Sequence, residues 1–589
     1  MKTIIELITE EVKQAFVQKG FEEKYGMVTI SNRPDLCQYQ CNGALAAAKQ
    51  YKTAPIKIAQ EMIESLQLSK KFKEISAIMP GFINITLSDE FLADYLNQMK
   101  AAKDYGCEKE PNPKTILIDY GGPNIAKPLH VGHMRSAIIG ESIKRLLKFC
   151  GNNVIGDAHL GDWGTQMGLV IAELKRRKPE IVYFDENYQG EYPKDAPFTI
   201  SELEEIYPAA SEYSKSNPEF KEEAKYITYQ LQNGHKGYTA IWNHMLEVSV
   251  SDLKKIYETL NVSFDLWKKE SDAQPYIPDM IQYFKDNNYT RISEGALVVD
   301  VKEDTDTKEI PPCMILKTDG ATLYNTTDLA TIVERMKLFS PDRIIYITDK
   351  RQELYFETVF RCARKTKLIG EDTVLDHIGF GTMNGKDGKP FKTREGGVMR
   401  LENLISSVNE EVYLKIMENR SMVEEDARAI AAQVGLAALK YGDLSNQVFK
   451  DYVFDIDRFT SFEGDTGPYI LYTIVRIKSI LAKFKEQKNE VVKKPVILPT
   501  VTASEQSLML ELAKFNEMIN TAYAETAPNR ICAYIYNLAN AFNSFYHDTK
   551  IITEEDASKQ SSWIELITLV QDILLTSIDL LGFEAPERM

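Results

Sequence analysis

The 589-residue chain is 44% hydrophobic and 26% charged, a composition typical of globular proteins that excludes a disordered or fibrous one. Since one hydrophobic core cannot serve this length, we expect about two to four domains. The net charge of −16 excludes a chain coated in nucleic-acid-binding lysines, although a local basic surface can still bind RNA. No apolar run is long enough to cross a bilayer and glutamates interrupt the N-terminal apolar residues, so we expect a cytoplasmic protein that binds no membrane.

The first 108 residues have a mixed α/β pattern. Apolar residues recur at helical spacing near the start, at Ile4, Ile5, Ile8, Val12 and Phe16. A turn and a strand are predicted over residues 80–86 (PGFINIT). The seven cysteines of the chain show no disulfide-like spacing, and the lone CxxxC of Cys37 and Cys41 is more typical of buried thiols than of a zinc site. We therefore expect no bound metal.

A polar, proline-bearing linker over residues 109–114 leads into a nucleotide-binding pattern. Residues 115–120 (TILIDY) predict a strand, residues 121–123 (GGP) a turn, and residues 134–149 a helix, which is how a parallel α/β unit begins. Two further strands are expected at residues 342–348 and around 378–381, after a largely helical insertion at about 179–294. From about residue 406 helical periodicity dominates, for example over residues 563–581.

Three of the seven histidines, His130, His133 and His159, lie close together in the sequence. His130 and His133 stand where the first strand meets its helix, and residues three apart share a helix face. Gly132 lets a ligand approach the backbone, and the helix N-terminus offers unpaired N–H groups. These parts suit a triphosphate, with charge stabilised at its α-phosphate. In isolation an HxGH is more often just the cap of a helix.

The flanking residues favour one of the two interpretations, a phosphate site over a simple helix cap. Residues 123–133 (PNIAKPLHVGH) resemble the HIGH signature of class I aminoacyl-tRNA synthetases, in the version of the arginyl subgroup. Residues 155–168 (IGDAHLGDWGTQMG) are also similar to that subgroup. The resemblance implies that ATP is bound by Pro123, Asn124, Ala126, Lys127, Pro128, His130, Val131, Gly132 and His133.

The second phosphate loop of class I synthetases, KMSKS, has a degraded counterpart at residues 388–397 (GKPFKTREGG). Lys389 and Lys392 keep the K-x-x-K spacing, but the Met and both Ser are replaced. In similar arginyl enzymes a lysine before HIGH is thought to supply the lost charge, and Lys127 occupies that place. The resemblance implies that Lys389 and Lys392 also bind ATP. It implies four catalytic residues, Lys127, His130, His133 and Lys392, with Lys127 ranked above Lys392.

A guanidinium pocket must be planar, acidic and dry, because the cation is bidentate and permanently charged. Tyr324 and Asp328 are four residues apart in a helical pattern and match the pair that holds the guanidinium in the arginyl family. The full set of arginine ligands that the resemblance implies is Asp119, Asn124, His159, Tyr324, Asp328 and Gln352. The chain departs from the family at Tyr355, where histidine is common, so a role for that imidazole is in doubt.

Both ends of the chain resemble RNA-binding domains of the arginyl family. The N-terminal part is similar to the domain that contacts the tRNA elbow. The tail matches the helical anticodon-binding domain at residues 467–472 (GPYILY) and 528–536 (PNRICAYIY). Unpaired bases are read by aromatic stacking and hydrogen bonds, although most of the tail's aromatic residues fall at core spacing. The expected tRNA contacts are Tyr469, Arg476, Lys478, Arg530 and Met589.

The resemblance covers essentially the whole chain. It implies an α/β fold with a class I Rossmann-type catalytic domain (residues 109–405, with the helical insertion), an N-terminal α+β domain (1–108) and a C-terminal all-α anticodon-binding domain (406–589). It implies ATP-dependent activation of L-arginine and transfer to tRNA(Arg), with Mg²⁺ accompanying ATP as substrate and no tightly bound metal or organic cofactor. It further implies a monomer that forms the adenylate only with tRNA bound.

Three alternatives remain open at this point. A small-molecule adenylyltransferase with an HxGH motif would be shorter than this chain. A catalytically silent tRNA-binding paralogue would have lost His130, His133 or Asp328, all of which are present. A synthetase with another amino-acid specificity is the nearest alternative, but cysteinyl and methionyl relatives would be expected to show zinc cysteines, which this sequence does not have.

Overall fold

The computed structural model describes residues 1–127, 129–389, 399–419, 422–487 and 495–589. The chain divides into two compact units, each described by itself. One comprises Met1–Lys109, Phe462–Asp579 and Glu584–Met589, and the other Glu110–Ser461 and Leu580–Phe583. The expected limits of the domains at 108–109 and 405–406 stay predictions, and by compactness the helices of residues 401–461 group with the parallel sheet.

The first unit combines a small sheet with a helical array. Its elements are α1 (Ile4–Gln18), β1 (Val28–Ile30), β2 (Tyr39–Cys41), α2 (Gly43–Tyr51), α3 (Pro55–Leu66), β3 (Phe72–Ile78), β4 (Phe82–Leu87), α4 (Asp89–Ala101), α16 (Gly467–Gln487), α17 (Ala503–Ala513), α18 (Phe515–Glu525), α19 (Pro528–Asp548) and most of α20 (Ala557–Leu581). The strands are antiparallel in the order β1-β2-β4-β3. As predicted, α1 buries Ile4, Ile8, Val12 and Phe16.

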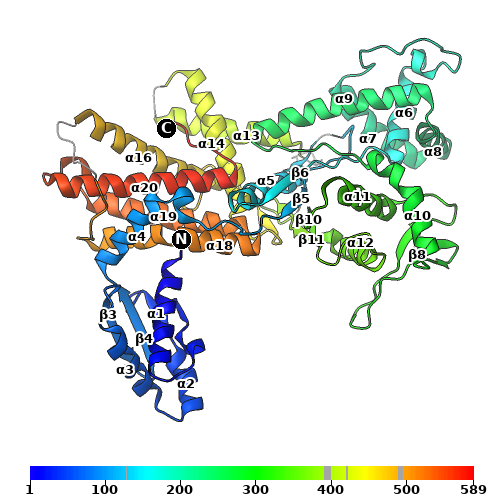
Figure 1. Cartoon of the computed structure of the whole chain (residues 1–589). Coiled ribbons are helices and arrows are strands. Elements are labelled where there is room, and N and C mark those ends of the chain that lie inside the picture. The colour runs from blue at the N-terminus through cyan, green and yellow to red at the C-terminus, as the bar shows by residue number, and fades with distance from the viewer. Residues whose placement is uncertain (128, 390–398, 420–421, 488–494) are drawn as a thin grey trace. The chain divides into compact units, whose positions relative to one another are not determined.

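The second unit is built on a parallel sheet. Its elements are β5 (Thr115–Asp119), α5 (Val131–Phe149), β6 (Asn153–Asp157), α6 (Thr165–Arg177), α7 (Ile200–Ser216), α8 (Pro218–Gln232), α9 (Lys236–Thr259), α10 (Ile277–Asp286), β7 (Arg291–Ser293), β8 (Ala296–Val299), β9 (Cys313–Leu316), α11 (Tyr324–Phe339), β10 (Arg343–Asp349), α12 (Glu353–Lys365), β11 (Val374–Phe380), β12 (Met383–Asn384), α13 (Leu401–Asn419), α14 (Glu424–Leu444), β13 (Tyr452–Val453) and α15 (Ile456–Phe459). The strand order is β11-β10-β5-β6, and every neighbouring pair is parallel (Figure 1).

The parallel sheet is buried on both faces, as helical crossovers require. Leu117, Ile344 and Tyr346 pack with α10, α11 and α12 in one buried cluster, while α5 packs against β5, β6 and β10. The insertion between β6 and β10 is helical through α10, as expected. It then adds a three-stranded antiparallel sheet, β7-β8-β9, whose strands are too short to give a clear alternation in the sequence.

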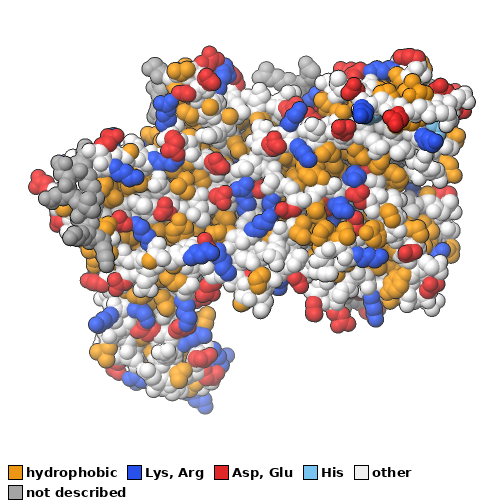
Figure 2. All heavy atoms as spheres, turned by 45° about the horizontal axis from the view of Figure 1, so that its top comes forward, with side chains coloured by type: hydrophobic (Ala, Val, Ile, Leu, Met, Phe, Trp, Pro, Cys, Tyr) orange, Lys and Arg blue, Asp and Glu red, His pale blue; other side chains and the backbone are white. Residues whose placement is uncertain are grey.

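Two expectations drawn from composition can be compared with the structure. Among the described residues, no helix has both the length and the apolar character that a bilayer crossing needs. Acidic and basic side chains are interspersed over the face drawn in Figure 2, so the net charge of −16 is spread out there rather than gathered.

Candidate active site

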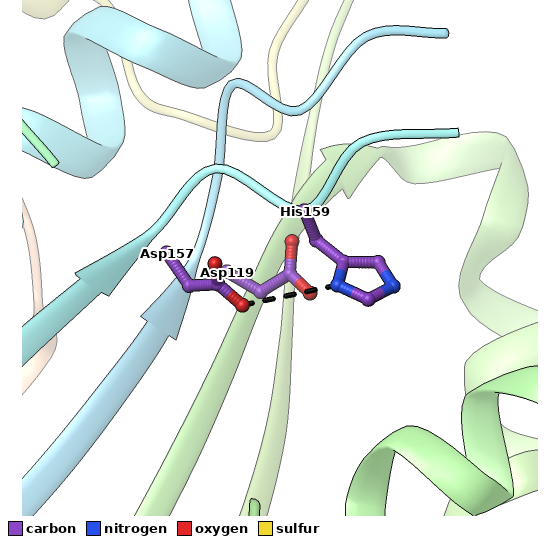
Figure 3. Close-up of side chains that lie close together, drawn as sticks. All are labelled: Asp119, Asp157 and His159. Atoms are coloured by element: carbon purple, nitrogen blue, oxygen red, sulfur yellow. Dashed lines mark ion pairs between the residues drawn. The ribbon is translucent and has the colours of Figure 1, made fainter. Parts of the chain in front are cut away.

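The carboxyl ends of neighbouring parallel strands bring three polar side chains together. Asp119 ends β5 and Asp157 ends β6, and the two residues are partners in the register of the sheet. His159 follows two residues later, with its Nδ1 3.8 Å from the Asp157 carboxylate (Figure 3). Ligands bind at this edge of an open α/β sheet, and the sequence predicts the ligand site at the same edge.

The three side chains of Figure 3 have the separation of metal ligands, since their donor atoms all lie within 4.8 Å of one another. A guanidinium is already present between the carboxylates. Nη2 of Arg335 donates to Asp119 Oδ2 at 2.6 Å and to Asp157 Oδ2 at 2.8 Å, and the Arg335 side chain is 2% exposed. The guanidinium of Arg335 therefore offsets the negative charge of the two carboxylates. The sequence pattern did not predict this residue.

The N-terminus of α5 fixes both histidines of the HxGH motif. His130 is the N-cap, and its Nδ1 accepts the N–H of Gly132 at 3.1 Å. His133 reaches back, its Nδ1 accepting the N–H of His130 at 3.2 Å. The two rings lie side by side, 3.8 Å apart between centroids. A side chain at Gly132 would press on His130, because its Cβ would lie 3.0 Å from Cε1 of that ring.

This capping arrangement determines what the histidines can offer a ligand. A ring nitrogen that accepts a hydrogen bond carries no proton, so each neutral imidazole holds its proton on Nε2. Burial, with Lys127 nearby, lowers the pKa of His130. Burial lowers the pKa of His133 to about 3, with His130 and Lys127 adding to the effect. Near neutral pH both residues are thus uncharged Nε2–H donors.

A cavity of about 520 Å³ lies beside these histidines, in the size range of small-ligand sites. It is lined by Asp119, Tyr120, Gly121, Gly122, His130, Val131, Gly132, His133, Arg135, Ser136, Ile347, Thr348, Asp349, Arg351, Gln352, Phe380, Gly381, Thr382 and Met383. Of the expected ligands, Asp119, Gln352 and residues 130–133 are therefore brought to one cavity.

Backbone contacts with other segments hold the turn that precedes α5. Asn124 forms a bridge with Gly161, and a Cβ at Gly161 would lie 1.9 Å from Asn124 Oδ1. Ala126 has a left-handed backbone (φ 60°), and its N–H donates to Ser249 Oγ at 3.1 Å. A non-glycine residue held in this region marks local strain of the kind found at functional sites.

The expected lysines differ in their surroundings. Lys127 places its ammonium over the ring of Tyr207, 4.5 Å from the centroid. Lys389 is exposed, and its N–H donates to Asp387 Oδ1 at 3.1 Å. Lys392, like Pro128, lies outside the described residues.

A hydrogen-bonded carboxyl group, that of Asp328, lies on α11. The hydroxyl of Tyr355 donates to Asp328 Oδ2, and burial raises the pKa of Asp328 while this bond acts against the rise. Tyr324, one turn earlier on α11, is 66% exposed. The residue at which the chain departs from its family thus contacts the carboxylate expected to bind the substrate.

Glu270 adds a second carboxyl group that sequence reasoning missed. Burial raises its pKa to about 7; His159 acts against the rise, and Asp328 and Asp162 add to it. The two ring nitrogens of His159 are buried, and neither has a hydrogen-bond partner among the described residues. Nothing in the sequence marks Glu270 among 86 acidic residues, because its position is fixed only by the fold.

The residues expected to contact tRNA lie in the first unit, and most are engaged within it. Arg476 donates to Asn543 Oδ1 at 2.6 Å and lies over the rings of Tyr472 and Tyr546. Lys478 pairs with Glu587, Arg530 pairs with Glu525, Tyr469 donates to Asn540, and Met589 is buried.

Models of known families match three stretches of the chain. They are described as "tRNA synthetases class I (R), catalytic domain" for residues 96–456, "DALR anticodon binding domain" for residues 470–589, and "Arginyl tRNA synthetase N terminal domain" for residues 2–87.

Relatives match over full length. An arginine–tRNA ligase of Agathobacter rectalis is 61% identical over 597 residues, and one of Alkaliphilus oremlandii is 59% identical over 589 residues; each alignment covers 100% of both chains. Among solved structures, that of arginyl-tRNA synthetase from Plasmodium falciparum superposes with a TM-score of 0.80 at 25% identity and 100% coverage of both chains.

Proposed function

This chain belongs to the arginyl-tRNA synthetases, and from that membership we propose that the edge of its parallel sheet carries both steps of arginine–tRNA ligation. The enzyme is an arginine–tRNA ligase with ATP as a substrate, and its partners are arginine and tRNA. We propose further that Mg²⁺ enters with ATP, that the tRNA is tRNA(Arg), and that the enzyme is a monomer acting in the cytoplasm.

In the first step, a carboxylate oxygen of arginine attacks the α-phosphorus of ATP. The bond from that phosphorus to the oxygen bridging to the β-phosphate breaks, and pyrophosphate leaves. Negative charge grows on the phosphate oxygens, where His130 and His133 offer Nε2–H groups and the α5 N-terminus offers partial positive charge. Lys127 supplies a full positive charge, and Lys389 and Lys392 are the further candidates for binding phosphate.

Asp328 and Glu270 are proposed to select the substrate. Burial raises the pKa of both carboxyl groups, and Asp328 adds to the rise at Glu270, so a cation between them would be favoured. A guanidinium can donate to two acceptors at once, whereas lysine is a point charge and citrulline would leave buried acceptors unpaired. Tyr324, on the same helix as Asp328, is proposed to contact the guanidinium as well.

The remaining ligands are proposed to hold the α-amino and carboxylate end of arginine between these two carboxyl groups and ATP. Asp119 and Gln352 line the cavity of the histidines, and Asn124 and His159 lie on the adjoining segments. In the second step a ribose hydroxyl of the terminal adenosine of tRNA attacks the activated carbonyl carbon, and AMP leaves. The enzyme contributes orientation and charge, and needs no covalent nucleophile.

Two observations carry this proposal: the desolvated carboxyl groups of Asp328 and Glu270, and the two neutral, capped imidazoles in the cavity that Asp119 also lines. The proposal is tested by ATP–pyrophosphate exchange with purified enzyme and tRNA(Arg), comparing arginine with lysine and citrulline. Exchange that depends on arginine alone supports the assignment, and comparable exchange with lysine contradicts it. Omitting tRNA should abolish exchange, as the family membership implies.

The elevated pKa of Glu270 predicts a pH-dependent affinity for arginine. When the pH falls below this pKa of about 7, the carboxyl group is protonated and no longer attracts the cation. Between pH 6 and pH 8 the ionised fraction rises about 10-fold, so the KM for arginine should fall by up to that factor as pH rises. Steady-state exchange kinetics over this range measure it.

Glu270→Gln is the control for this prediction, because it keeps the shape of the side chain and removes the titration. The variant should show a higher KM for arginine that hardly changes with pH. A variant with the same pH slope as the parent enzyme would assign the titration to another group.

A further inference from the structure

Helix α7 of the insertion contacts the segment that leads to the histidine motif. Tyr207 on this helix lies under the ammonium of Lys127, with the nitrogen 4.5 Å from the ring centroid. Cation–π contacts of this kind attract the ammonium to the face of the ring, and the attraction is stronger where the contact is desolvated. The contact therefore restricts a lysine whose four-carbon stem would otherwise sample many positions.

The same face of α7 carries a second contact, one turn earlier. Glu204 accepts a hydrogen bond from Nη1 of Arg400 at 2.5 Å, and the Glu204 side chain is 12% exposed. Arg400 in turn forms an antiparallel bridge with His130, and the N–H of Leu401 donates to Leu129 O at 2.9 Å. Two contacts, Tyr207 with Lys127 and Glu204 with Arg400, therefore hold helix α7 next to His130. They fix the position of Tyr207 relative to the N-terminus of α5.

An aromatic partner has a consequence that a carboxylate partner would not have. A carboxylate would neutralise the lysine and compete with phosphate for it. The face of a ring attracts the ammonium through its quadrupole and leaves the full positive charge available to an anion. Among the described residues, no carboxylate lies within ion-pair distance of Lys127.

We propose that Tyr207 is a positioning residue for the activation step, holding the Lys127 ammonium toward the phosphate site without neutralising it. The inference rests on the proposed function, in which Lys127 stabilises charge on the phosphates. It gives the helical insertion a part in catalysis through two side chains, Tyr207 and Glu204.

A double-mutant cycle tests the proposal. Arginine-dependent ATP–pyrophosphate exchange is measured with tRNA(Arg) for the parent enzyme, Tyr207→Leu, Lys127→Ala and the double variant. Tyr207→Leu should lower kcat about 10-fold in the parent background and have little effect in the Lys127→Ala background, while the KM for arginine stays constant. Tyr207→Phe keeps the ring face and should retain most of the rate.

The matched control is Tyr213→Leu on the same helix. The ring of Tyr213 lies under Arg176, 4.9 Å from the ring centroid, and takes part neither in the contact with Lys127 nor in that with Arg400. This variant should leave the exchange rate unchanged. Thermal unfolding of each variant reports whether it folds, and Tyr207→Met takes the place of Tyr207→Leu if the latter does not.

The possible outcomes separate the two levels of the proposal. Equal losses from Tyr207→Leu in both backgrounds would overturn the positioning role and leave the role of Lys127 intact. A faster Tyr207→Leu enzyme would also overturn it, because the ring would then be restraining the lysine. An unchanged rate in Lys127→Ala would remove the catalytic assignment of Lys127, and the positioning role with it.

Discussion

Replacing Lys127 by alanine should lower the rate of arginine activation by about 10²-fold or more, with little change in the affinity for tRNA. The physical reason is the place of this cation. It lies before α5, next to two histidines that burial keeps neutral, so the histidines supply donors but no charge. Single-turnover formation of arginyl-adenylate in the presence of tRNA(Arg) measures the effect.

Lys254→Ala provides the control for this variant. Lys254 also lies over an aromatic ring, that of Trp267 at 5.4 Å, and belongs to the same unit of the structure. It should activate arginine at the parent rate. A Lys127→Ala enzyme that does the same would transfer the electrostatic role to Lys392, whose alanine variant should then show the loss.

Replacing Asp328 by asparagine should lower kcat/KM for arginine by about 10²- to 10³-fold. Loss of one member of a buried, hydrogen-bonded charge pair costs about 2–5 kcal/mol, and each 1.4 kcal/mol is about tenfold. The KM for ATP should change little, because the cavity beside His130 and His133 keeps its lining. Exchange kinetics with arginine and ATP varied separately distinguish the two constants.

Tyr355→Phe is the graded companion of that variant. It keeps the Asp328 carboxylate and removes only the hydroxyl that donates to it. We expect a loss of about 10-fold in kcat/KM for arginine, in line with about 1.5 kcal/mol for a hydrogen bond to a charged group. A normal KM for arginine in Asp328→Asn would contradict the assignment of this carboxylate to the guanidinium.

The parallel sheet was predictable because its signals are local. Residues 115–120 (TILIDY) and 342–348 (DRIIYIT) are rich in β-branched and aromatic residues over the length of a strand, and they form β5 and β10 with shifts of a residue at the ends. The helix expected from residue 134 begins at Val131, because His130 and His133 cap it reciprocally. The small sheet β7-β8-β9 was missed, since strands of three or four residues show too little alternation to be recognised.

The candidate site was predictable only where one short segment carries it. The histidine motif lies within a single turn, so spacing alone places both rings on one helix end. Arg335 and Asp119 are 216 residues apart, and no local pattern indicates that they meet. The same holds for Glu270 and Tyr207, whose neighbours in space come from other elements of the fold.

A crystal structure with a non-hydrolysable arginyl-adenylate analogue would show whether these carboxyl groups and the two histidines serve one substrate. We predict that the guanidinium donates to the carboxylate of Asp328, and that Nε2 of His130 or His133 lies within hydrogen-bond distance of the group replacing the phosphate. An analogue bound with its guanidinium away from Asp328 and Glu270 would contradict this assignment.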